Sequence, residues 1–157
     1  RDVPMSEELM QVYQKTVLEH SRNPHHFGAL EGATRKAEGF NPLCGDKITI
    51  YLSTSTDGQQ ITEASHETSG CAICMSSASM MADAVQTLSA AAATSLCAQL
   101  EALLNGNSAT DTGPGMPLES LAGVRAYPTR VKCATLPWRT LMAALSGETK
   151  ATTEHSN

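Results

Sequence analysis

A change of hydrophobic period near residue 70 is the feature that most limits what this chain can fold into. In the stretch DKITIYLSTS, which begins at Asp46, apolar and polar side chains alternate, and this pattern predicts a half-buried strand. Asp57-Gly58 predicts a turn, after which QQITEASHETS (59–69) predicts an antiparallel return strand. A weaker pattern predicts a third strand at about 33–40. From Cys71 onward, apolar and small residues recur instead with helical spacing.

The same reasoning predicts a series of helices around the strands. They are expected at 6–21, with Ser6 as the cap, and at 72–88, 96–106, 117–124 and 133–147. We expect a loop at 107–115 and an extended segment at 125–132, and we expect Pro137 in the first turn of the last helix. The predicted fold class is α+β: a two-layer sandwich in which helices cover one face of a small antiparallel sheet. One domain is expected over 1–150, with a flexible C-terminal tail at 151–157.

Charge and cysteine content exclude several classes of function. The 157 residues carry a net charge of −5, which argues against a nucleic-acid partner because such proteins need a basic face. The sequence has no apolar run of membrane-spanning length and no signal-peptide pattern at its start, so we expect no membrane partner and a cytoplasmic location. Five cysteines cannot all pair within one chain, and in the cytoplasm they should be mostly reduced, so some of them are candidates for metal binding or catalysis.

Three thiols and one carboxylate lie at the expected ends of elements, where side chains converge. Cys44 and Asp46 flank Gly45 before the first clear strand, while Cys71 and Cys133 open two predicted helices. A helix N-terminus stabilises a thiolate. Four such ligands suit tetrahedral zinc, and they also suit an iron–sulfur cluster. For any single cysteine, burial as a small apolar residue is the competing interpretation.

Four blocks in this order give the chain a specific resemblance to a known family. They are YQKTVLEHSRNPHHFG, NPLCGD, SGCAICMSSASMMADAV and VKCATLPWRTL. Together they resemble the SufU branch of the IscU-like proteins, with its SufE/IscU-like fold. The resemblance implies that Cys44, Asp46, Cys71 and Cys133 bind Zn²⁺. It also implies a sulfurtransferase whose Cys44 accepts persulfide sulfur from a SufS-type cysteine desulfurase, for a downstream iron–sulfur scaffold complex. In this family a histidine of the desulfurase is thought to replace the acceptor cysteine on zinc.

Two details favour the SufU branch over the IscU branch. IscU-type scaffolds have a histidine immediately before the last cysteine, where this chain has Lys132, and the segment 105–130 resembles the SufU insertion. Arg125 within that segment matches a family arginine that lies near the metal. For Arg125 and Lys132, a solvated surface charge is the competing interpretation.

Other residues of ligand type have ordinary alternatives. Cys74 stands where the family has a small hydroxyl residue, and it is either packing, a spare ligand or a second acceptor. Cys97 is expected to be structural, and Met80 and Met81 to belong to the core. Further candidate metal ligands are His20, His25, His26 and His66. His20, near the end of the first helix, is expected to pair with the helix dipole instead.

Three other functions compete with sulfur transfer. The same ligands could carry an assembled iron–sulfur cluster, as in a scaffold protein. Cys71 and Cys74 form a CxxC at a helix start, which is typical of thiol oxidoreductases. That interpretation leaves the other three ligands unused. Finally, the four ligands could form a structural zinc module that only docks other proteins.

Overall fold

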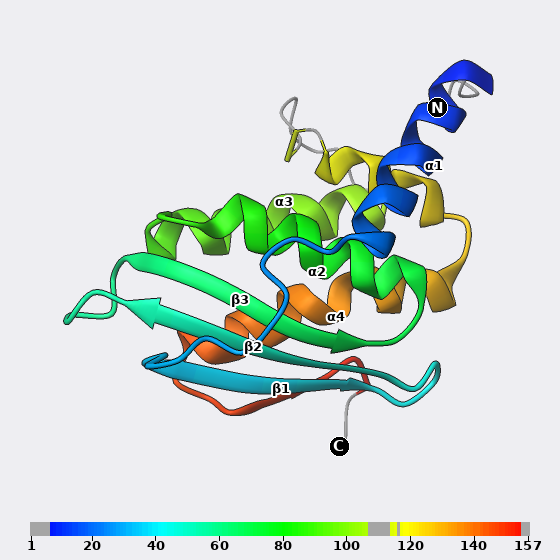
Figure 1. Ribbon diagram of the computed structural model, residues 1–157. Coiled ribbons are helices and arrows are strands. Elements are labelled where there is room, and N and C mark those ends of the chain that lie inside the picture. Colours follow the sequence, from blue (N-terminus) through cyan, green and yellow to red (C-terminus); the bar gives the residue numbers. More distant parts are fainter. Residues whose placement is uncertain (1–6, 107–113, 116, 155–157) are drawn as a thin grey trace.

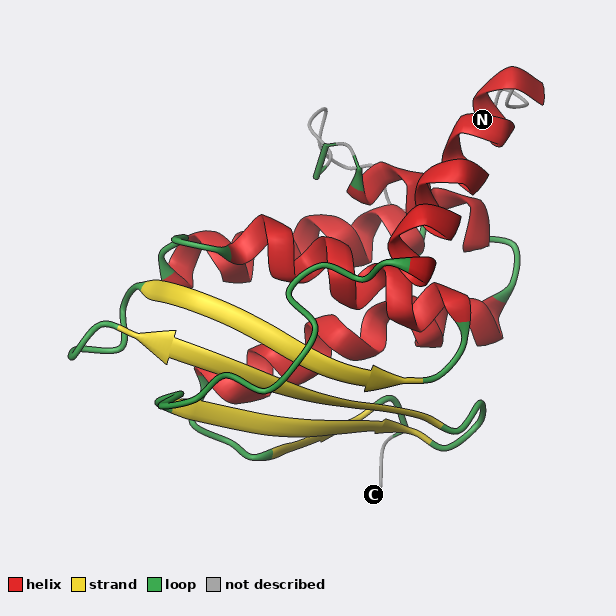
Figure 2. Cartoon of the chain, in the orientation of Figure 1, coloured by secondary structure: helices red, strands yellow, loops and turns green. Residues whose placement is uncertain are grey.

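The fold is described from a computed structural model, which describes residues 7–106, 114–115 and 117–154. The elements are α1 (Glu7–Arg22), β1 (Arg35–Asn41), β2 (Asp46–Thr54), β3 (Ile61–Ser69), α2 (Ala72–Val85), α3 (Ala90–Leu104), the 3₁₀ helix η1 (Leu118–Val124), α4 (Pro128–Leu145) and β4 (Lys150–Thr152). The helices gather on one face of the sheet (Figures 1 and 2). This arrangement confirms the predicted α+β sandwich. Ser6 and most of the loop expected at 107–115 lie outside the described residues.

The four strands lie in the order β3-β2-β1-β4. β1 and β2 pair antiparallel from Arg35↔Leu52 to Asn41↔Asp46, and β2 pairs antiparallel with β3. β4 pairs parallel with β1, so the sheet is mixed rather than purely antiparallel. The chain returns along α4 before it reaches β4, and this crossover makes a parallel pairing possible.

The C-terminal segment is part of the sheet. We expected a flexible tail at 151–157, but the structure places residues 151–154 in the last strand or directly after it. Lys150–Thr152 form β4, and the side chain of Thr153 is buried. A strand of three residues is too short to produce a recognisable period, so the sequence pattern does not reveal it. Residues 155–157 lie outside the described part of the chain.

The core lies between the sheet and the helices α2 and α4, which pack directly on it. On β2 the alternation is as predicted: Ile48, Ile50 and Leu52 are buried, and Lys47 on the opposite face is exposed. Met80 and Met81 are fully enclosed, which confirms that they belong to the core. α2 is rich in small residues on its buried side, and small side chains let a helix approach its neighbours closely.

The last helix begins earlier than predicted. α4 begins at Pro128, so the segment 125–132 is not extended as expected, and Pro137 lies inside the helix rather than in its first turn. Proline is favoured at the first helical position because no partner is needed for its missing N–H. Two prolines could serve there, and the chain uses Pro128. Cys133 therefore lies in the second turn and not at the mouth of α4.

The remaining helices mostly follow the prediction. α3 begins at Ala90, six residues before the expected start, because Ser89 caps it by accepting a hydrogen bond from the backbone N–H of Ala92 at 3.0 Å. η1 covers the predicted short helix at 117–124. Within the described residues, no helix combines the length and the apolar character that a membrane span requires.

Candidate metal centre

The turn between β1 and β2 places Cys44 and Asp46 together. Asn41 and Asp46 face each other at the end of the strand pair, and the backbone N–H of Gly45 donates to the carbonyl of Asn41 at 2.8 Å. Gly45 has φ +75°, a left-handed conformation that glycine adopts without steric cost. The turn leaves Cys44 exposed and directs Asp46 inward, where its side chain is 0% exposed. Gly45 thus lets a thiol and a carboxylate two residues apart reach one site.

The carboxylate of Asp46 is held at both oxygens. Its Oδ1 accepts the backbone N–H of Cys71 at 3.0 Å, and its Oδ2 accepts the side-chain amide of Asn41 at 3.0 Å. A Cβ at position 70 would lie 2.4 Å from Oδ1, so the carboxylate fits only because that residue is Gly70. Asp46 is therefore oriented before any ligand arrives.

The three thiols come from three different parts of the chain and meet at this carboxylate. Cys71 is the N-cap residue of α2, as predicted, and it has no side-chain cap hydrogen bond. The sulfurs of Cys133 and Cys44 lie 3.5 Å apart. One ligand atom from each of Cys44, Asp46 and Cys133 lies within 4.8 Å of the others. The thiol of Cys71 is near enough to that of Cys133 to raise its pKa, but it is not among the atoms that lie within this distance of one another.

Burial is the largest influence on the protonation of Cys133. It raises the pKa of this thiol, and hydrogen bonds to Asp46, Cys44 and Cys71 raise it further. Without a cation, Cys133 is a neutral thiol. A metal ion reverses that preference, because it binds the thiolate and displaces the proton.

The donor set fits one tetrahedral ion. Two sulfurs at about 2.3 Å from a tetrahedral zinc lie about 3.8 Å apart, close to the 3.5 Å between Cys44 and Cys133. The carboxylate of Asp46 is already fixed beside them. The structure therefore brings Cys44, Asp46 and Cys133 together at a candidate metal site, with Cys71 close to Cys133.

Arg130, rather than Arg125, is the arginine beside the thiols. Its guanidinium interacts with the sulfurs of Cys71 and Cys133, and Cys71 is the largest cause of the raised pKa of Arg130. The Nε of Arg125 donates instead to the carbonyl of Leu103 at 2.7 Å, at the end of α3. Because α4 begins at Pro128, Arg130 lies three residues before Cys133 on the same helical face.

Of the other candidates, Lys132 and Cys97 have their contacts away from the thiol cluster, whereas Cys74 is buried close to it. Lys132 forms a 2.6 Å ion pair with Glu154, and it lines a cavity of about 470 Å³ together with Arg125. Cys74 is 0% exposed, and burial raises the pKa of its thiol far above the usual value. Cys97 is also buried, and burial raises its pKa to about 12. Both buried thiols are protonated near neutral pH and are poor nucleophiles.

Besides Arg130, sequence reasoning missed two residues that support the site. Asn41 holds Asp46, and its own Oδ1 accepts the hydroxyl of Thr153 at 3.0 Å. Both side chains are buried. β4 therefore positions Thr153, Thr153 orients Asn41, and Asn41 orients Asp46. The only signal in the sequence was the position of Asn41 at the start of the NPLCGD block.

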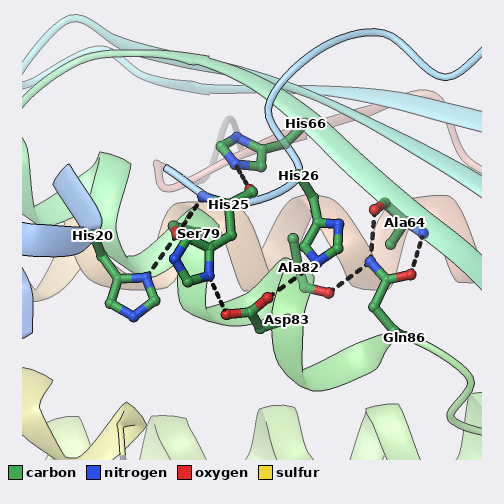
Figure 3. Close-up of polar contacts among 9 residues, drawn as sticks. All are labelled: His20, His25, His26, Ala64, His66, Ser79, Ala82, Asp83 and Gln86. Atoms are coloured by element: carbon green, nitrogen blue, oxygen red, sulfur yellow. Dashed lines mark hydrogen bonds and ion pairs between the residues drawn. The ribbon is translucent and has the colours of Figure 1, made fainter. Parts of the chain in front are cut away.

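The histidines that were candidate ligands lie elsewhere. His20, His25 and His26 gather near Asp83, towards the far end of α2 from Cys71 (Figure 3). His20 contacts the hydroxyl of Ser79 at 2.7 Å, an interaction that the helix-dipole prediction did not foresee. His66 is buried in β3, which lowers its pKa to about 4.

The fold and this cluster define a small α+β protein with a candidate metal site of three thiols and a carboxylate. The chain belongs to the family described as NifU-like N terminal domain, whose model matches residues 12–146.

Two curated relatives show comparable similarity. The chain is 33% identical over 137 residues to the zinc-dependent sulfurtransferase SufU of Bacillus subtilis strain 168, covering 87% of this chain and 91% of the relative. It is 34% identical over 143 residues to the iron–sulfur cluster assembly scaffold protein IscU of Streptococcus pyogenes serotype M1, covering 91% and 88%.

A solved structure has the same fold. It is the putative iron–sulfur cluster assembly scaffold protein for the SUF system of Fervidobacterium islandicum AW-1. The TM-score is 0.78 at 30% identity, over 86% of this chain and 97% of that one.

Proposed function

We propose that this protein is a zinc-dependent sulfurtransferase of iron–sulfur cluster assembly. It accepts sulfane sulfur from a SufS-type cysteine desulfurase and passes it to a downstream scaffold complex. The observation that carries the proposal is the unequal exposure of the four ligands. Cys44 is exposed, whereas Asp46 and Cys133 are fully buried. Cys71 is partly exposed, so a partner enzyme can reach Cys44 most readily while Asp46 and Cys133 remain inside the protein.

The names of the relatives support a role in iron–sulfur cluster assembly, and the residues support sulfur transfer within it. The curated relatives include a sulfurtransferase and a scaffold at 33% and 34% identity, so similarity alone does not separate the two functions. At the position before the last cysteine, Lys132 has its ammonium paired with Glu154. An ammonium has no lone pair, so Lys132 cannot ligate a cluster iron as an imidazole can.

Zinc is the resident ion in this proposal, held by Cys44, Asp46, Cys71 and Cys133. A bound Zn²⁺ keeps the thiols deprotonated and takes no part in redox chemistry. Asn41 and the backbone N–H of Cys71 fix the carboxylate that completes the site. Hydrogen bonds to a metal ligand from neighbouring residues orient that ligand and raise metal affinity.

The transfer step requires only the exposed thiol and the donor. The Cys44 thiolate attacks the outer sulfur of a desulfurase persulfide, and a new S–S bond forms at Cys44 while the S–S bond of the donor breaks. The donor cysteine leaves as a thiolate, so no external oxidant or reductant is consumed. Arg130 lies beside the neighbouring thiols and stabilises negative charge on sulfur. Leu43, which is 58% exposed next to Cys44, offers an apolar contact for the partner.

A stimulation assay tests this function. The cognate desulfurase is assayed for alanine formation with the wild-type protein, with Cys44→Ala and with Cys97→Ala as a matched control. We expect stimulation by the wild type and by Cys97→Ala, because Cys97 is buried away from the cluster, and none by Cys44→Ala. If zinc is bound but the wild-type protein does not stimulate turnover, the protein is a docking module and the proposal is wrong.

The scaffold is the second candidate, because the relative named as a scaffold matches 91% of this chain. Metal analysis of protein purified without oxygen separates the two. Colourless protein that contains zinc and no stoichiometric iron or sulfide is the result we expect. A brown product with stoichiometric iron and sulfide would favour the scaffold.

A further inference from the structure

A second cluster of metal-ligand side chains lies towards the other end of α2. One ligand atom from each of His20, His25 and Asp83 lies within 4.8 Å of the others. The side chains converge from the end of α1, the loop that follows it and the last turns of α2 (Figure 3). His25 Nδ1 lies 2.5 Å from Asp83 Oδ2.

The hydroxyl of Ser79 holds the two histidines of this cluster. Ser79 Oγ lies 2.7 Å from Nδ1 of His20 and accepts the backbone N–H of His25 at 2.8 Å. Ser79 and Asp83 are one helical turn apart, so they lie on the same face of α2. One face of α2 therefore orients both imidazoles and supplies the carboxylate.

The loop that carries His25 is fastened to the edge of the sheet. His66 is fully buried in β3, and its Nε2–H donates to the carbonyl of His25 at 3.1 Å. The backbone N–H of His66 donates to the carbonyl of His26 at 3.1 Å, and Gly28 donates to the carbonyl of His66 at 2.7 Å. These contacts fix the backbone at the cluster.

His26 completes the support of Asp83. Its backbone has φ +55°, a left-handed conformation that is uncommon outside glycine. Its Nε2–H donates to Asp83 Oδ1 at 3.0 Å, which is the oxygen that His25 does not contact. In metal sites, a hydrogen bond to the oxygen of a carboxylate that does not bind the ion holds that carboxylate in position.

The cluster is separate from the thiol site. Asp83 lies twelve residues after Cys71 on α2, a distance of about 18 Å along the helix axis. His25 and Asp83 are partly exposed, with side-chain exposures of 50% and 38%, so an ion can enter from solvent.

We propose that His20, His25 and Asp83 bind one divalent transition-metal ion of the zinc class, with His26 as a positioning residue for the carboxylate. Two imidazoles and one carboxylate are a three-ligand set that leaves a coordination position open to water. Imidazole ligands favour zinc and its neighbours over magnesium or calcium. On binding, the ion takes the place of the proton shared by His25 and Asp83, and that proton goes to solvent. The ion links the end of α1 to α2 and is independent of the proposed sulfur transfer.

Zinc titration of the full chain tests this site. Bound zinc is counted by equilibrium dialysis, while the ring nitrogens of the histidines are followed by ¹⁵N NMR. We expect the wild-type protein to bind one more zinc than His25→Gln or Asp83→Asn, and to shift the ring signals of His20 and His25. His26→Gln is expected to weaken this binding by about 10- to 100-fold. The matched control is Asp57→Asn, which alters an exposed carboxylate in the β2–β3 turn and should bind as wild type does.

The test compares the number of bound zinc ions in the wild type with the number in each variant. Any zinc bound by the thiol cluster is common to all of them and does not affect this difference. His25 and Asp83 are both exposed, and circular dichroism checks that their variants fold. The proposal would be overturned if the wild type and both variants bound the same number of zinc ions. It would also be overturned if zinc left the ring signals of His20 and His25 in the wild type unchanged.

Discussion

The side-chain amide of Asn41 donates to Oδ2 of Asp46 at 3.0 Å, and both residues are 0% exposed. This buried pair connects the C-terminal strand to the thiol cluster, because Asn41 also accepts the hydroxyl of Thr153. The orientation of the carboxylate is therefore set by a segment more than one hundred residues away in the sequence.

Replacing Asn41 should loosen the metal. Asn41→Ala removes the amide that donates to Oδ2 of Asp46 and the oxygen that accepts the hydroxyl of Thr153, so we expect zinc affinity to fall by about 10- to 100-fold. The free energy of unfolding should fall by about 1–3 kcal/mol, since buried polar groups become unsatisfied. Chelator competition and denaturant unfolding measure the two effects. Thr153→Val should lower zinc affinity less, because Thr153 contacts Asp46 only through Asn41. An equal loss of affinity in both variants would contradict the proposal that Thr153 acts through Asn41.

The two arginines should differ in their effect on sulfur acceptance. Arg130→Ala removes a positive charge near Cys71 and Cys133, and because this guanidinium is exposed and screened by solvent, the rate of sulfur acceptance should fall by about two- to fivefold. Arg125→Ala is the control, because Arg125 contacts a backbone carbonyl of α3 instead. Single-turnover transfer from a persulfidated desulfurase measures both rates. A larger loss in Arg125→Ala would reinstate the expectation from family resemblance.

Cys74 should be dispensable for sulfur transfer. It is fully buried, and burial raises the pKa of its thiol, so it provides little thiolate at neutral pH. Cys74→Ser should retain nearly all desulfurase stimulation, with some loss of stability because a hydroxyl replaces a sulfur in the core. Loss of all activity in a variant that still folds and binds zinc would favour the thiol oxidoreductase.

His66 should make the fold sensitive to mild acid. Burial lowers its pKa from 6.5 to about 4, so the folded state favours the neutral imidazole. Its stabilising contribution is complete above pH 6.5 and is lost as the pH falls towards 4, because the unfolded chain binds the proton first. A depression of this size corresponds to about 3 kcal/mol at most. Thermal unfolding at pH 7 and pH 5 should show a smaller decrease in Tm for His66→Gln than for wild type, whereas parallel decreases would exclude His66 as the cause.

Much of the fold was predictable because its signals are local. The alternation in β2 and the small-residue face of α2 are periodic over many residues, and both elements were predicted. β4 was missed because three residues show no period. The predicted start of the last helix was wrong because Pro128 and Pro137 both suit a first turn, and the local sequence does not decide between them.

The contrast between local sequence signals and three-dimensional contacts also explains which residues of the candidate metal centre were predictable. The four candidate ligands carry distinctive chemistry, so Cys44, Asp46, Cys71 and Cys133 could be chosen before their positions were known. Asn41 and Arg130 are ordinary polar residues whose roles depend on three-dimensional neighbours. Arg130 reaches the thiols because α4 begins at Pro128, which places it on the same helical face as Cys133.

The central claim is that Cys44 is the exposed sulfur acceptor of a zinc-bound cluster. The most direct measurement is mass spectrometry of the zinc-loaded protein after incubation with its cognate desulfurase and cysteine, with each thiol mapped by peptide. The account predicts one added sulfur on Cys44 and none on the buried Cys74 and Cys97. Persulfide on another cysteine, with Cys44 unmodified, would contradict it.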